Sequence, residues 1–173
     1  MIDPPYRARG AAAARGLVML RVVVGGIFLY AGVGKLTLYN MVDFLPVPVT
    51  SLQWQLELPA RLATWLATHP SGPMAAVVRD LLMPHGIVVA AVVAWGQTVT
   101  GVLLVVGAFT NLASLLGIVI AITLAIAASS RGPLDARQYI LLVALCVSFI
   151  LGRAGEVAGM DSWRRERRRN RDL

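Results

Sequence analysis

The chain has 173 residues, of which 57% are hydrophobic and only 14% are charged, and its net charge is +7. Soluble domains usually have about a quarter of their residues charged, so this composition excludes an ordinary soluble protein and predicts one domain in lipid. A single cysteine, Cys146, excludes an internal disulfide, and His69 and His85 are too far apart for a histidine metal motif. We find no metal, haem or nucleotide motif.

Four segments are long and apolar enough, or nearly so, to cross a bilayer, which takes roughly 20 residues. In chain order they are 17–36, 86–109, 111–129 and 138–151. The second and third are joined by Thr110-Asn111 alone, which predicts a tight antiparallel helical hairpin. No strand-like alternation competes with helices. We therefore expect an all-α membrane protein, a four-helix bundle that forms a single domain over 1–173.

Small residues at four-residue spacing predict the faces through which these helices pack, because helices in lipid associate at small side chains. The first span offers Gly26, Tyr30 and Gly34 as such a stripe, with Gly25 and Gly32 alongside. The second and third spans carry longer stripes, which are Gly86, Ala90, Ala94 and Thr98, and then Ala113, Gly117, Ala121, Ala125 and Ser129.

The segment 37–85 between the first two spans is apolar for a loop. We expect short amphipathic helices at 58–68 and 73–83, lying on the membrane surface with Trp54 and Trp65 at headgroup depth. Pro59 and Pro73 suit first helical turns, and Ser71 is a plausible cap. The alternative is a mobile loop.

Arginines flank the bundle asymmetrically. They are frequent before the first span and in the tail 152–173, whereas the segment 37–85 has only Arg61 and Arg79. Basic flanks face the cytoplasm, so we expect both termini to be cytoplasmic and 37–85 external, in a cytoplasmic membrane of bacterial type. The tail adjoins a span, so its expected partner is anionic lipid rather than nucleic acid.

Polar groups inside the spans are the candidates for binding, because they are costly in lipid. Gln97 lies near the middle of the second span beside Trp95. Its amide could meet a ligand carbonyl or, equally, bond a neighbouring helix. Arg21 lies about one turn inside the first span, where an anchor to lipid phosphate is the alternative role. Tyr30 and Lys35 lie toward the other end of that span.

In order and spacing, several short motifs resemble the DoxX/DoxD-like family of four-helix membrane proteins. They cover roughly residues 21–161 and are Leu20-Arg21, Phe28-Leu29-Tyr30-Ala31-Gly32-Val33-Gly34-Lys35-Leu36, Trp95-Gly96-Gln97, 101–110, Gly152-Arg153-Ala154-Gly155 and Met160-Asp161. Some relatives are described as the small subunit of a thiosulfate:quinone oxidoreductase, so the resemblance implies redox association. The family often has glutamate where this chain has Gln97, and the amide lacks that charge and any proton relay.

Two functions follow as competing hypotheses. In the first, the chain is a quinone-interacting subunit of a membrane oxidoreductase, with quinone as cofactor and a pocket made of Arg21, Tyr30, Lys35, Trp95 and Gln97. In the second, it is a non-catalytic accessory subunit that packs with other membrane subunits or with copies of itself. The sequence contains no complete catalytic constellation. A transporter is a weaker hypothesis, because the spans lack a broken helix or a paired charge.

Overall fold

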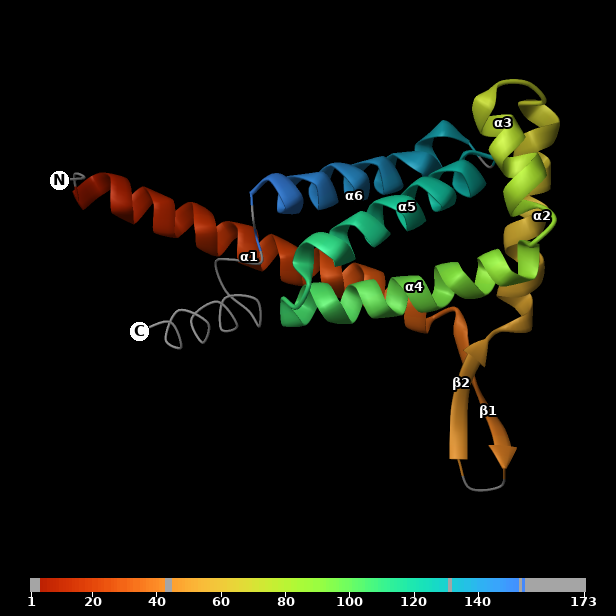
Figure 1. The fold of residues 1–173 in the computed structure, drawn as a ribbon, viewed down its shortest axis with the longest axis horizontal. Coiled ribbons are helices and arrows are strands. Elements are labelled where there is room, and N and C mark those ends of the chain that lie inside the picture. Colours follow the sequence, from red (N-terminus) through yellow and green to blue (C-terminus); the bar gives the residue numbers. More distant parts are fainter. Residues whose placement is uncertain (1–3, 43–44, 131, 153, 155–173) are drawn as a thin grey trace, which may run out of the picture.

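The computed structural model describes residues 4–42, 45–130, 132–152 and 154. Four long helices lie side by side, and a hairpin and shorter helices gather at one end of them (Figure 1). The elements are α1 Pro4–Val33, β1 Leu36–Val42, β2 Leu45–Thr50, α2 Leu52–Thr68, α3 Pro73–Val77, the π-helix η1 Val78–Leu82, α4 Gly86–Val106, α5 Thr110–Ser129 and α6 Pro133–Leu151.

The predicted four-helix membrane bundle is confirmed. The segments long and apolar enough to span a membrane are Arg15–Val33, Gly86–Val106, Thr110–Ser129 and Leu134–Leu151. The fourth helix starts five residues earlier than the predicted 138, at Pro133. Proline suits the first turn of a helix, and Asp135 in that turn faces the positive end of the helix dipole. These residues interrupt the apolar run without interrupting the helix.

The bundle consists of two closely packed pairs of helices, α1 with α4 and α5 with α6. The contact between α4 and α5 joins the two pairs. The start of α1 and the end of α6 lie at one end of the bundle, which we call the terminal end (Figure 1). The hairpin and α2 lie at the opposite end, the loop end. Which end faces the cytoplasm stays a prediction.

The packing seam of α1 differs from the predicted stripe. A Cβ added at Gly32 would lie 2.5 Å from the backbone nitrogen of Thr98, and one added at Gly101 would lie 2.4 Å from the nitrogen of Leu29. Gly26 has nothing within 4 Å, and Tyr30 is 85% exposed. A Cβ added at Gly25 would lie 2.9 Å from the backbone nitrogen of Val105, so the inward stripe consists of Gly25 and Gly32, seven residues apart on nearly the same face of the helix. The predicted stripes of α4 and α5 do face inward, with Ala90, Ala94, Ala113 and Ala121 buried.

The hairpin of β1 and β2 contradicts the expectation that the chain has no strands. Its register pairs Leu36 with Thr50 and Leu38 with Pro48. Pro46 and Pro48 in β2 weaken the strand signal in the sequence. They are two residues apart, so both nitrogens point to the same side of the strand, and a two-stranded sheet tolerates them when that side is its free edge.

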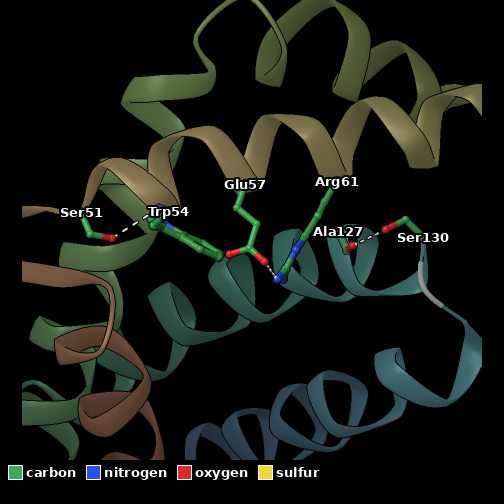
Figure 2. Close-up of polar contacts among 6 residues, drawn as sticks. All are labelled: Ser51, Trp54, Glu57, Arg61, Ala127 and Ser130. Atoms are coloured by element: carbon green, nitrogen blue, oxygen red, sulfur yellow. Dashed lines mark hydrogen bonds and ion pairs between the residues drawn. The ribbon is translucent and has the colours of Figure 1, made fainter.

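Helix α2 is longer than predicted and packs across the ends of α4 and α5 (Figure 1), and its position on a membrane surface stays a prediction. It starts at Leu52, and the Ser51 hydroxyl accepts a hydrogen bond from the Trp54 backbone N–H at 3.3 Å (Figure 2). Pro59 is therefore inside the helix, where its ring packs against Gly86. Trp54 and Trp65 are buried in the protein.

The second predicted helix of this segment also has different bounds. It comprises α3 and the π-helix η1, so it ends at Leu82, and its cap position is Gly72 rather than Ser71. Gly72 has a φ of 108°, a conformation that serine adopts only with strain.

At the terminal end, Arg21 contacts both the end of α4 and Ala154, which lies three residues after α6. The arginine is only 2% exposed, and its Nη1 donates a hydrogen bond of 2.9 Å to the carbonyl oxygen of Ala154. Its guanidinium also lies against Gly107, which ends α4 in the left-handed conformation. The C-terminal ends of helices carry partial negative charge, and this attracts a buried cation. Arg21 therefore does not extend to lipid phosphate, its alternative role from the sequence.

The seam predicts opposite outcomes for two glycines of α1. Gly32→Ala should destabilise the protein by roughly 1–3 kcal/mol, because the new methyl group overlaps the α4 backbone. Gly26→Ala is the matched control and should be neutral or stabilising by roughly 0.5–1 kcal/mol, because alanine favours helix and this site is open. Thermal unfolding in one detergent would measure both. Equal behaviour of the two variants would contradict the seam.

Arg21→Met should lower stability by roughly 1–3 kcal/mol, because it leaves a buried carbonyl without its donor. Arg15→Met, at an exposed position of the same helix, is the control and should change stability little. Arg21→Lys should not restore stability, because an ammonium cannot reproduce the planar set of donors. Full rescue by lysine would show that charge alone matters.

Candidate ligand-binding site

A cavity of about 280 Å³ lies between α1, α4 and α6. We call it the inner cavity. Apolar side chains make up most of its wall, and they are Ile27, Phe28, Ala31, Leu141, Leu142 and Leu145. Its polar lining residues are Lys35, Gln97, Gln138 and Tyr139. An apolar chamber with a few polar groups is the usual form of a small-molecule site.

Gln97 is the most unusual of these polar groups. It is only 2% exposed, and its Oε1 has no hydrogen-bond partner among the described residues. A buried acceptor without a partner costs about 1–3 kcal/mol, so its presence calls for an explanation. Because Gln97 lines the inner cavity, a ligand there could supply the missing donor.

Lys35 follows the end of α1, just outside the membrane-spanning segment Arg15–Val33. Its Nζ donates a hydrogen bond of 2.8 Å to the carbonyl oxygen of Ala31 and lies 4.8 Å from the centre of the Trp54 ring. Burial, and secondarily the positive charge of Arg61, lowers the pKa of Lys35 to about 8. Lys35 is therefore a cation at neutral pH that can release its proton under mild conditions.

A second cavity, also of about 280 Å³, lies between Lys35 and α2. We call it the outer cavity. Its lining is polar and consists of Gly34, Lys35, Ser51, Gln53, Trp54, Glu57, Arg61 and Tyr139. Arg61 and Glu57 form an ion pair one helical turn apart on α2 (Figure 2). Lys35 and Tyr139 line both cavities and so lie where the two meet.

Of the five residues predicted to bind a ligand, the structure brings Lys35 and Gln97 to one cavity. Arg21 lies fourteen residues from Lys35 along the chain, which is about 21 Å in a helix. It is therefore at the terminal end of the bundle, away from this cavity. Tyr30 points away from the bundle, and Trp95 is 39% exposed and is not among the described residues lining either cavity. A binding role for any of the five stays a prediction.

Sequence reasoning missed most of the remaining polar lining. Gln138 and Tyr139 lie in the second turn of α6, a region that the predicted helix start treated as its boundary. Trp54, Glu57 and Arg61 come from α2, which was expected on the membrane surface. The spacing of Trp54, Leu58, Leu62 and Trp65 was the available signal, because it places one face of α2 in the protein.

Within the described ranges, no three His, Cys, Asp or Glu side chains come together where they could hold a metal ion. Cys146 is fully buried, and its sulfur lies next to Gly117 in the contact between α5 and α6. Its position fits that of a small apolar filler.

Among known proteins, the family model DoxX matches residues 16–130, which is more than half of the chain. The match includes Lys35 and Gln97 and stops before α6, so Gln138, Tyr139 and the motifs at 152–161 lie outside it. No curated protein and no solved structure matches the chain. The chain belongs to the DoxX family, and its four apolar helices make it a multi-pass membrane protein.

Proposed function

We propose that this chain is a quinone-binding subunit of a membrane oxidoreductase, with the inner cavity as the site for the quinone head group. The observation that carries the proposal is the buried, unpartnered Oε1 of Gln97 in a cavity with mainly apolar walls. A quinone combines a flat apolar ring with two carbonyl oxygens, and both parts have counterparts in this lining.

Gln97 suits both oxidation states of a quinone. Its amide nitrogen can donate to a quinone carbonyl, and its amide oxygen can accept from a quinol hydroxyl. Lys35, as an ammonium, supplies a second and stronger donor. Phe28 and the three leucines of α6 offer apolar surface to the ring. A lipid-soluble tail can leave between α1 and α6, because α1 packs mainly on α4 and α6 mainly on α5.

In this proposal the chain binds and orients the quinone, and a partner subunit exchanges electrons with it. The two cavities are lined by donors, acceptors and apolar groups, and the cysteine lies elsewhere, in the contact between α5 and α6. The cofactor and the partner are both part of the proposal.

Replacement of Gln97 separates binding from folding. Gln97→Leu should weaken the binding of decylubiquinone about five- to tenfold, because about 1 kcal/mol of hydrogen bonding is lost. The same variant should keep or raise thermal stability, because it removes a buried acceptor that has no partner. Titration calorimetry in detergent would measure the affinity, and thermal unfolding would measure the stability.

Thr123→Val on α5 is the matched control, because it also removes a polar group from a span but lies outside both cavities. It should leave quinone affinity unchanged. Wild-type protein that does not bind decylubiquinone would overturn the proposed function. A Gln97→Leu variant that unfolds more easily, with unchanged affinity, would instead make Gln97 a structural residue.

The accessory-subunit hypothesis has one specific observation in its favour. The outer face of α1 has a shallow pocket of about 610 Å³, where Gly26 and Gly34 lie beside Tyr30. Most other small residues of the spans are already used inside the bundle. Native mass spectrometry from mild detergent should then show a complex that Gly26→Leu disrupts. A wild-type monomer would count against this hypothesis.

A further inference from the structure

Lys35 is the only lysine in the chain, and every other Lys-or-Arg position is an arginine. The difference is chemical as well as electrostatic. An arginine in a protein stays protonated, whereas a lysine ammonium can release a proton when it is partly buried. This single lysine lies where the polar outer cavity meets the apolar inner cavity.

We propose that Lys35 passes protons between water in the outer cavity and the head group of a quinone in the inner cavity. The proposal rests on the proposed function, since it requires a quinone next to Gln97. It adds a catalytic role for Lys35 that binding alone does not require.

Among the charged and titratable groups around Lys35, none is as well suited as Lys35 itself to pass protons between the two cavities. From α2 come Arg61, which stays charged, and Glu57, which is paired with Arg61 and lines only the outer cavity. From α6 comes Tyr139, whose phenol can donate or accept a hydrogen bond. α4 contributes Gln97, which carries no labile charge, and α1 contributes the Ala31 carbonyl that accepts from Nζ.

The proton step can be written in full. When a quinone is reduced, it takes two electrons from a reduced partner subunit and two protons. An N–H bond of the Lys35 ammonium breaks and an O–H bond forms on the quinone oxygen, which leaves a neutral amine. The amine then regains a proton from bulk solvent through water in the outer cavity, and the opposite quinone oxygen takes the second proton from the partner subunit that supplies the electrons. Oxidation of a quinol runs these steps in reverse.

The pKa of Lys35, lowered to about 8 by burial and by Arg61, suits a group that both gives and takes protons near neutral pH. A quinone carbonyl that accepts from the ammonium favours the charged form and should raise this pKa by roughly one unit. Above that pKa the donor is lost. Quinone binding should therefore weaken roughly tenfold between pH 7 and pH 10.

A single lysine makes the test direct. In protein labelled with ¹³C-lysine, the side-chain signal reports Lys35 alone, and its titration midpoint can be followed without ligand, with oxidised decylubiquinone and with its quinol. We expect the midpoint with the quinone to lie above the other two. Calorimetry at several pH values would follow the affinity in parallel.

Lys35→Arg separates charge from proton release. It should bind decylubiquinone within about threefold of wild type at pH 7, because the cation is kept, and its affinity should stay flat to pH 10. Arg79→Gln, which removes a cation from η1 outside both cavities, should keep the wild-type pH profile.

Two failures can be told apart. If decylubiquinone binds but the Lys35 signal titrates identically in all three states, or if Lys35→Arg keeps the wild-type pH profile, the proton role is wrong and quinone binding stands. If decylubiquinone does not bind at any pH, the proposed function itself fails, and this inference fails with it.

Discussion

The close approach of α1 to α4 is the contact on which the candidate site depends. Gly32 and Gly101 allow the two backbones to touch, and a side chain at either position would push the helices apart. Gly32 meets α4 at Gln97 and Thr98, and Lys35 follows three residues later. The glycine that joins the helices thus also brings the lysine and the glutamine to the same cavity. The contact that packs α1 on α4 therefore also forms the candidate site.

Helix α2 supplies the polar wall of the outer cavity at the loop end of the bundle. The Trp54 indole N–H donates a hydrogen bond of 3.0 Å to the Ala90 carbonyl, which holds α2 on α4. The ring centre of the same tryptophan lies 4.8 Å from the Lys35 nitrogen and 5.9 Å from the central carbon of the Arg61 guanidinium. One side chain therefore fixes the helix and forms part of the outer cavity wall. As a result, the polar cavity adjoins the apolar one, and Lys35 lies between them.

Apolar run length was enough to predict the four spans, because a bilayer requires about 20 apolar residues whatever the tertiary contacts are. It did not show which face of α1 turns inward. Gly25, Gly26, Gly32 and Gly34 all suit close packing, and only the position of α4 selects Gly25 and Gly32. The residues of the candidate site were likewise predictable only in part. Lys35 and Gln97 were recognisable as polar groups in or beside apolar runs, whereas Tyr139 and Arg61 reach the cavities only because α6 and α2 fold against α1.

The amide at position 97 matters for the chemistry of Lys35. The resemblance to the family implies glutamate as a common residue there, and a carboxylate facing the same cavity would attract the ammonium and raise the pKa of the lysine. Its proton would then be held more tightly, as half of a buried ion pair. Gln97 keeps the hydrogen-bonding capacity of glutamate without the charge. Burial, and secondarily the positive charge of Arg61, acts in the opposite direction to a carboxylate and lowers the lysine pKa. A neutral amide in place of a carboxylate thus leaves the lowered pKa of Lys35, which burial and the fixed cation of Arg61 produce, without an opposing negative charge in the inner cavity.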